Sequence, residues 1–216
     1  MLKRCMDIVL SVFLLIVALP ILAVAAIAIK IDSEGPVFFV QPRMSRGFKR
    51  FALIKLRTMR IRCDGAAYTL GADPRITYVG HWLRWSKVDE LPQLWNVLRG
   101  EMSMVGPRPV IPQLAFEFVK AYIHLLEVRP GLTDPASMKY CREEELLALF
   151  PDPLLHFKAV ITPDKLRISA AYLERATVWS DLGVLTRTAI ALFPARLLPR
   201  YVGTLLFGRK ENTDPF

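Results

Sequence analysis

Two adjacent carboxylates, Asp89 and Glu90, are the residues of this 216-residue chain whose types and spacing point most directly to chemistry. Leu91 and Pro92 follow them, and this pattern predicts that Asp89 caps a helix with Pro92 in its first turn. The positive end of a helix stabilises a carboxylate and also binds phosphate. A carboxylate there can attack phosphorus to form an acyl phosphate, whereas helix capping alone is the structural alternative.

Eight lysines and arginines between positions 41 and 62 supply positive charge that could meet a phosphate. Two of them, Lys55 and Arg57, are expected on one face of a strand because side chains alternate along it. Arg108 and Arg129 adjoin prolines, which present a guanidinium rigidly enough to grip phosphate through two hydrogen bonds. Ordinary surface exposure, or contact with lipid headgroups, is the alternative for each of these cations.

Residues 8–29 are 22 consecutive uncharged and mostly apolar residues, interrupted by Pro20. A straight helix of that length would measure roughly 33 Å, enough to span a bilayer core. Pro20 lacks an N–H group and bends the helix, and basic residues, which favour the cytoplasmic side, flank both ends. We therefore expect a re-entrant helix that enters one leaflet and returns. A proline-kinked span and a cleaved signal peptide are the alternatives.

Carboxylates, fixed cations and a membrane segment in one chain favour phosphoryl transfer on a lipid. A net charge of +9 and a pI near 9.7 imply an acidic partner. Lipid phosphate or substrate phosphate explains this charge more simply than nucleic acid, for which the sequence has no motif. Mg²⁺ is the expected cofactor, because a carboxylate and a diphosphate repel each other until a cation bridges them.

Several other kinds of chemistry lack their residues in this sequence. The three cysteines form no Cys-x-x-Cys pair, which argues against a disulfide scaffold and against a zinc site. The sequence also contains no HExxH, Walker or GxGxxG motif. Zinc hydrolysis, P-loop nucleotide hydrolysis and Rossmann-type dinucleotide binding are therefore unsupported.

The elements that must position the chemical residues are expected to be mainly helical, with one small sheet. Residues 37–41 and 51–59 predict a β-hairpin around a basic turn. Trp82 and Trp85 suit the headgroup level of a membrane, with burial in the core as the alternative. An apolar tail at 186–207 is expected to lie on the membrane surface. Helices are expected at residues 78–87, 91–98, 111–128, 143–149, 165–175 and 181–192.

The order of motifs along the chain resembles the monotopic phosphoglycosyl transferases, the bacterial sugar transferases that start polyprenol-linked glycan assembly. The matches are dense over residues 1–133 and looser over residues 134–190. The matching motifs are KRxxD at 3–7, GPVFF at 35–39, KLRTM at 55–59, DPRIT at 73–77, VDELPQLxNVL at 88–98, GEMSMVGPRP at 100–109 and RPGLT at 129–133.

The resemblance implies a two-step reaction that moves a sugar-1-phosphate from a UDP-sugar to undecaprenyl phosphate and releases UMP. This reaction is the first membrane step of cell-surface polysaccharide or glycoconjugate assembly. Asp89 would be the nucleophile, Glu90 a base or magnesium-orienting partner, and Lys55 an essential cation, with Asp89 and Glu90 also holding Mg²⁺. The residues expected to bind substrate phosphate or nucleotide are Arg43, Arg57, Arg75, Arg108 and Arg129.

Together these features predict an α+β, helix-dominated monotopic membrane protein with a small β-hairpin or sheet and interfacial amphipathic helices. Residues 1–30 would form the re-entrant helix, kinked at Pro20. Residues 31–216, including the interfacial helices and the amphipathic tail, would form a catalytic domain on the cytoplasmic face of the bacterial inner membrane. The expected partners are a UDP-sugar, undecaprenyl phosphate and membrane phospholipid, with a homodimer left open and nucleic acid not expected.

One segment departs from the family pattern. Many relatives follow the RPGxT motif with GWAQ, whereas this chain has DPASMKY from position 134 and three glutamates from position 143. This departure suggests a sub-branch with its own sugar or uridine pocket. The alternative function is a non-catalytic, membrane-anchored scaffold of a glycan-assembly complex, and an intact set of Lys55, Asp89, Glu90 and Arg108 argues against it.

Overall fold

The computed structural model describes residues 2–60, 73–141 and 143–192, so most of the expected membrane-surface tail lies outside the described residues. Its elements form a helix-dominated α+β structure with two small sheets, which confirms the expected fold class at this level.

The first element, α1 (Leu2–Asp32), is one helix of 31 residues that contains Pro20. This helix is long and apolar enough to cross a membrane by length and composition. The re-entrant arrangement and the domain division at residue 30 stay predictions.

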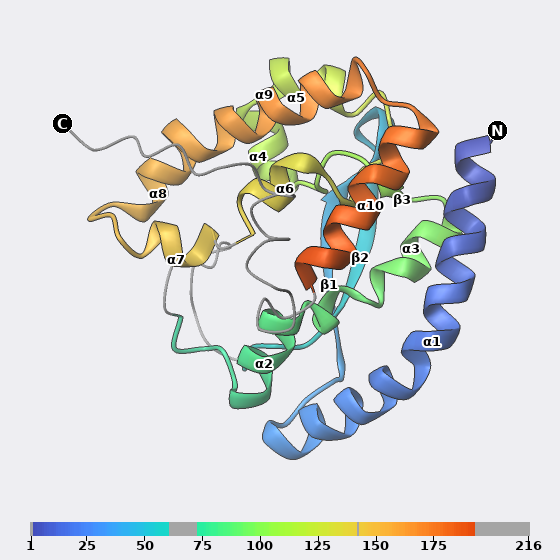
Figure 1. Ribbon diagram of the computed structural model, residues 1–216. Coiled ribbons are helices and arrows are strands. Elements are labelled where there is room, and N and C mark those ends of the chain that lie inside the picture. Colours follow the sequence, from blue (N-terminus) through green and yellow to red (C-terminus); the bar gives the residue numbers. More distant parts are fainter. Residues whose placement is uncertain (1, 61–72, 142, 193–216) are drawn as a thin grey trace, which may run out of the picture.

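Charged side chains attach the start of α1 to the rest of the chain, and Figure 1 shows α1 running along one side of the other elements. Asp7 is only 2% exposed and accepts hydrogen bonds from Ser103 Oγ at 2.9 Å and from the Met104 backbone N–H at 3.0 Å. Arg4 donates to the carbonyl oxygens of Val97 and Leu98 at 2.6 and 2.8 Å. A buried carboxylate with two donors fixes this turn of the helix against the domain.

The end of α1 is attached to the same domain through an arginine that follows the hairpin. Arg57 is buried and donates to the carbonyl oxygens of Ser33, at 2.7 Å, and of Glu34. These carbonyls lie just beyond the last turn of α1, where a cation also balances the negative end of the helix dipole. Ala25 and Ile29 pack there against Leu56 and Leu83.

The predicted hairpin is confirmed as β1 (Phe38–Met44) paired antiparallel with β2 (Arg50–Leu56), around the turn η1 (Arg46–Phe48). The helix α3 (Gln93–Arg99) lies along β2 and is joined to it by one buried amide. Asn96 accepts a hydrogen bond from the Ile54 N–H at 3.1 Å and donates to the Ala52 carbonyl at 2.8 Å. Gly100, with φ +79°, ends α3 because glycine adopts the left-handed conformation without strain.

A second sheet was not predicted and consists of β3 (Ser103–Val105) paired parallel with β4 (Gly131–Thr133). The loop after β3 passes very close to β4. A Cβ atom on Gly131 would lie 2.1 Å from the Gly106 nitrogen, and the Gly131 N–H donates to the Pro107 carbonyl at 2.9 Å. Only glycine fits this approach, and it sets the position of the residue that follows Pro107.

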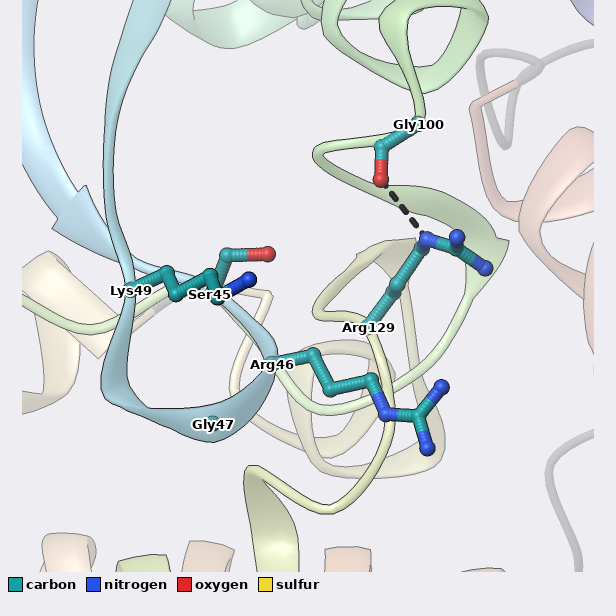
Figure 2. A pocket seen from close by; sticks show the side chains of 6 residues that line it. All are labelled: Ser45, Arg46, Gly47, Lys49, Gly100 and Arg129. Atoms are coloured by element: carbon teal, nitrogen blue, oxygen red, sulfur yellow. Dashed lines mark hydrogen bonds between the residues drawn. The ribbon is translucent and has the colours of Figure 1, made fainter.

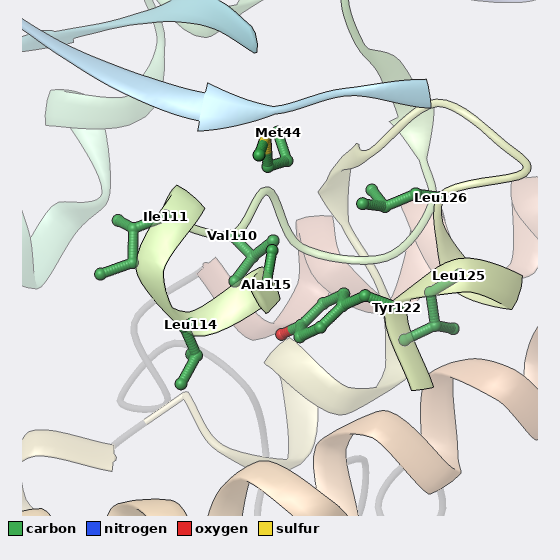
Figure 3. Packing of buried hydrophobic residues seen from close by; sticks show 8 residues of the cluster. All are labelled: Met44, Val110, Ile111, Leu114, Ala115, Tyr122, Leu125 and Leu126. Carbon is green, nitrogen blue, oxygen red and sulfur yellow. The ribbon is translucent and has the colours of Figure 1, made fainter. Parts of the chain in front are cut away.

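The expected single helix over residues 111–128 is wrong. The structure has two helices, α4 (Pro112–Glu117) and α5 (Val119–Leu125), separated by Phe118 with φ −111° and ψ 37°. The break allows residues from both helices to cover one end of the hairpin (Figure 3). The cluster they form consists of Met44, Val110, Ile111, Leu114, Ala115, Tyr122, Leu125 and Leu126.

Each of the five other expected helices has a counterpart with shifted ends, and the described residues also form two short helices, α6 (Pro135–Lys139) and α8 (Pro153–His156), that were not predicted. Trp82 and Trp85 lie on α2 (Tyr78–Ser86) and are 65% and 68% exposed, so the alternative of core burial is wrong for them. The interfacial placement of such helices stays a prediction. The helices after β4 are α6 (Pro135–Lys139), α7 (Glu143–Leu147), α8 (Pro153–His156), the π-helical turn η3 (Phe157–Ile161), α9 (Thr162–Leu173) and α10 (Val178–Leu192).

Replacing Asp7 with alanine should destabilise the protein because it leaves the Ser103 hydroxyl and the Met104 N–H buried without their acceptor. We expect a loss of about 3 kcal/mol in the free energy of unfolding, measured by denaturant unfolding of the purified chain in detergent. The exposed neighbour Cys5, changed to alanine, serves as the matched control on the same helix. Equal stability of the two variants would contradict the anchoring role of Asp7.

Candidate active site

The structure brings four of the predicted residues together at one end of α3. Lys55 comes from the end of β2, the two carboxylates from the 3₁₀ turn η2 (Val88–Glu90), and Arg108 from the loop after β3. Arg108 grips Glu90 with two hydrogen bonds, Nη2 to Oε1 at 2.5 Å and Nη1 to Oε2 at 3.3 Å. Lys55 Nζ lies 3.6 Å from the same Oε1 atom. Elements distant in the sequence thus converge on one carboxylate.

The predicted capping role of Asp89 is wrong. Helix α2 ends at Ser86, the left-handed conformation of the next residue, Lys87 (φ +57°), turns the chain into η2, and α3 begins only after Pro92. Asp89 therefore lies in a short turn between two helices, and its side chain makes no cap hydrogen bond to α3. The alternative that Asp89 serves only as a helix cap is therefore not supported by the structure.

Asp89 is a buried carboxylate without a counter-ion among the described residues. It is 6% exposed, and its Oδ1 atom has no hydrogen-bond partner within the part of the chain that the structure describes. Burial, followed by the negative charge of Glu90, raises the pKa of Asp89 to about 6, against the opposing charges of Lys55 and Lys87. Such a carboxylate is poorly solvated and available to react.

Glu90 has the opposite electrostatic environment. Burial favours its neutral form, but the charges of Arg108 and Lys55 outweigh burial and hold the pKa of Glu90 well below its ordinary value. The pKa of Arg108 is raised in turn by Glu90. Burial lowers the pKa of Lys55, and Glu90 partly offsets this shift. Glu90 therefore holds the cations, and Asp89 stays unpaired beside them.

The other predicted binding residues lie in different places. Arg43 donates to the Pro109 carbonyl and to Gln41 Oε1, and its charge lowers the pKa of Lys55, so it adjoins the four-residue group. Arg57 binds carbonyls beyond α1 and shares no partner with Lys55.

Two further predicted arginines are held by local partners. Arg75 pairs with Asp73 at 2.6 Å and lowers the pKa of that carboxyl. Arg129 Nε donates to the Gly100 carbonyl at 2.6 Å, at the opposite end of α3 from Glu90. The structure therefore does not gather all five arginines around the carboxylates, and their roles toward substrate stay predictions.

One buried acid near the site was not predicted as a functional residue. Asp134 is 1% exposed and accepts hydrogen bonds from the Ser137 N–H at 2.8 Å and from Ser169 Oγ at 2.7 Å. The pKa of Arg108 is raised mainly by Glu90, and the charge of Asp134 adds to this shift, so Asp134 lies near that guanidinium. The sequence signal was its place before Pro135 in the segment that departs from the family pattern.

The carboxylates fit a magnesium ion that takes most of its ligands from elsewhere. Both oxygens of Glu90 accept from Arg108, whereas Oδ1 of Asp89 is buried and without a partner among the described residues. Mg²⁺ is commonly held by one or two carboxylates, with water and substrate phosphate completing its shell. Within the described residues no group of three or more His, Cys, Asp or Glu side chains forms a complete protein site.

Comparison with known proteins identifies the class to which this geometry belongs. A family model described as bacterial sugar transferase matches residues 1–195. The chain belongs to the bacterial sugar transferase family. That match covers α1, both sheets and every residue of the four-residue group, so the family assignment rests on the site as well as on the apolar helix.

Individual relatives carry related names. The undecaprenyl-phosphate glucose phosphotransferase of Komagataeibacter xylinus is 37% identical over 199 residues, which cover 86% of this chain and 35% of the relative. The UDP-glucose:undecaprenyl-phosphate glucose-1-phosphate transferase of Caulobacter vibrioides is 37% identical over 198 residues, covering 88% and 69%. The UDP-N-acetylgalactosamine-undecaprenyl-phosphate N-acetylgalactosaminephosphotransferase of Aeromonas hydrophila is 37% identical over 141 residues, covering 63% and 33%. The matched part of the chain thus covers about a third of the length of the Komagataeibacter and Aeromonas relatives.

Replacing Asp89 with asparagine should stabilise the fold at neutral pH. A carboxyl whose pKa is raised in the folded state stabilises that state fully only below its unfolded pKa, and this contribution is lost as the pH rises through about 6. In magnesium-free buffer we expect Asp89→Asn to be more stable than the unchanged protein by up to about 3 kcal/mol at pH 7.5, and by little at pH 4. Denaturant unfolding at both pH values measures this. A variant less stable at pH 7.5 would contradict the unpaired state of Asp89.

Proposed function

We propose that this chain moves a sugar-1-phosphate from a UDP-sugar to undecaprenyl phosphate and releases UMP, as the first membrane step of polysaccharide or glycoconjugate assembly. The observation that carries the proposal is the buried Asp89 carboxylate, which has no ion pair in the described chain although two cations lie next to it on Glu90. The names of relatives in the bacterial sugar transferase family support the same donor and acceptor.

The chemistry proposed for Asp89 is nucleophilic. Its carboxylate attacks the β-phosphorus of the UDP-sugar, a carboxyl–phosphorus bond forms, and the bond from the β-phosphorus to the bridging oxygen breaks to release UMP. A phosphate oxygen of undecaprenyl phosphate then attacks the same phosphorus and releases the Asp89 carboxylate. Two displacements of this kind keep each step simple, because the protein mainly positions the groups and balances charge.

The cations beside Asp89 have a distinct task in this proposal. Arg108 and Lys55 are held near the reacting group by Glu90 and supply fixed positive charge where negative charge builds up on the transferring phosphoryl group. Both cations are held by Glu90 rather than by Asp89, so their charge faces the site without a close contact to the Asp89 carboxylate. Asp89 and Glu90 are the residues proposed to hold Mg²⁺, which would supply further charge neutralisation on the diphosphate when bound.

The contacts of α1 support a re-entrant placement at the membrane. Lys3 and Arg4 at its start, and Ser33 and Glu34 just after its end, contact the same domain. A straight span would separate these two ends by the thickness of a bilayer. We therefore place both ends on the cytoplasmic face of the inner membrane, with the turn around Pro20 inside one leaflet and the exposed Trp82 and Trp85 at the headgroup level.

The activity predicts release of UMP from UDP-sugars in the presence of Mg²⁺ and undecaprenyl phosphate. Relatives are named for glucose and for N-acetylgalactosamine, so the assay should use a panel of UDP-sugars. We expect Asp89→Asn to lower the rate at least about a thousandfold and Arg108→Gln about a hundredfold. Arg50→Gln, an exposed cation on β2 away from the carboxylates, should leave the rate unchanged. Absence of UMP release by the unchanged protein would favour the scaffold alternative.

The re-entrant placement predicts that two exposed cysteines lie on one side of the membrane. Cys5 is near the start of α1 and Cys141 lies in the domain. Each can be kept as a single cysteine by changing the others, including Cys63, to serine. With a membrane-impermeant maleimide, both should react in inverted membrane vesicles and neither in spheroplasts. Labelling of Cys5 from outside the cell and of Cys141 only from inside would show a span instead.

A further inference from the structure

A cavity of about 400 Å³ opens beside the turn of the hairpin, away from the carboxylates (Figure 2). Its walls come from the hairpin turn, from the end of α3 and from the segment that precedes β4. The residues that line it are Ser45, Arg46, Gly47, Lys49, Gly100 and Arg129. Three of these six are cations and none is an acid, so the cavity has the composition of an anion-binding site.

This cavity is distinct from the site around Asp89. Lys49 immediately precedes β2 and Lys55 is its last residue but one, and the six residue steps from one to the other correspond to about 20 Å of extended strand. Helix α3 runs beside the strand, with Glu90 near its beginning and Gly100 at its end. A phosphate that contacts Arg129 in the cavity therefore does not reach the Asp89 carboxylate.

The positive charge at the cavity is not balanced by nearby carboxylates. Within the described residues Arg46 and Lys49 have no ion-pair partner. Glu101 is close in sequence to Gly100, but its carboxylate receives a hydrogen bond from Asn96 at 2.7 Å and lies 3.5 Å from Arg99.

A second guanidinium adds to this excess. A Cβ atom on Gly100 would lie 3.3 Å from Nη2 of Arg4 and 4.0 Å from Nη2 of Arg129, so both guanidinium groups lie close to Gly100. The carbonyl oxygens at the end of α3 disfavour an anion, but Arg4 and Arg129 already bind three of them. Two neighbouring cations repel each other, and an anion bound between Arg129 and the hairpin turn would relieve that repulsion.

We propose that this cavity binds a phosphate-bearing anion as a second anion site, independent of the transfer reaction. Arg129 offers a rigid fork for phosphate oxygens, Lys49 and Arg46 add mobile charge, and Ser45 forms part of the wall. The anion is either free phosphate or the phosphate of a lipid headgroup. Phe48, in the same turn, stacks on Phe116 with 6.2 Å between the ring centroids, and Phe116 is 56% exposed. These rings place an apolar surface beside the cations, as binding of a lipid would require.

The test measures binding of inorganic phosphate to the purified full chain in non-ionic detergent, by calorimetry at constant ionic strength. Saturating UDP is present so that the site around Asp89 is filled. The double variant Arg46→Gln/Lys49→Gln removes two cations that hold no structural partner, and we expect it to weaken phosphate binding about tenfold or more. Arg50→Gln removes the adjacent exposed cation that does not line the cavity and should leave binding unchanged.

Three results would overturn the proposal. The first is absence of phosphate binding in the presence of UDP, which would make the cavity part of the donor site or no site at all. The second is equal binding by the double variant, and the third is an equal loss in Arg50→Gln, which would indicate diffuse surface charge. Asp89→Asn should bind phosphate normally and yet release UMP at least about a thousandfold more slowly, so failure of the transfer reaction and failure of this site give different results.

Vesicle binding separates the two sources of the phosphate. Unchanged and double-variant protein are compared on phosphatidylcholine vesicles with and without phosphatidylglycerol. A gain from phosphatidylglycerol that only the unchanged protein shows would assign the site to a lipid headgroup. An equal gain for both proteins, together with loss of inorganic phosphate binding in the double variant, would assign it to free phosphate.

Discussion

The charge balance around Glu90 is the interaction on which the rest of the site depends. Arg108 and Lys55 both direct their charge to this one carboxylate, and the adjacent Asp89 stays buried without an ion pair among the described residues. Two neighbouring acids thus acquire opposite properties, because one is neutralised by cations and the other is mainly desolvated. A pair of carboxylates with pKa values driven apart is a common basis for dividing chemical roles.

This charge balance requires three chain segments to keep their relative positions, and the membrane helix helps to hold them. Asn96 joins α3 to β2, which carries Lys55. Asp7 on α1 holds the Met104 N–H of β3, the strand that leads to Arg108. The helix that is long and apolar enough to cross a membrane is therefore part of the support for the site. Such a link would suit the proposed transfer to a lipid-borne acceptor, because the reacting group keeps a fixed position relative to α1.

Local patterns predicted much of this structure, and tertiary contacts account for the rest. The apolar run, the hairpin and the carboxylate pair follow from residue type and spacing. The 3₁₀ turn does not, because it depends on the left-handed conformation of Lys87, which no propensity favours. The sheet of β3 and β4 has three residues in each strand, too few for an alternation pattern. The carbonyl partners of Arg57 beyond α1 are likewise visible only in the folded chain, and its role toward substrate phosphate stays a prediction.

The central claim is that Asp89 becomes covalently bonded to the transferred sugar phosphate, and mass spectrometry of the intact protein tests it most directly. The purified chain is mixed with Mg²⁺ and its UDP-sugar without lipid acceptor, and the reaction is quenched. The intact mass of the protein is then measured, and the modified peptide is identified by sequencing. The account predicts a gain equal to one sugar phosphate less water, located on the peptide that contains Asp89 and removed by added undecaprenyl phosphate. UMP formation without any adduct in single-turnover samples, or an adduct on another residue, would contradict it.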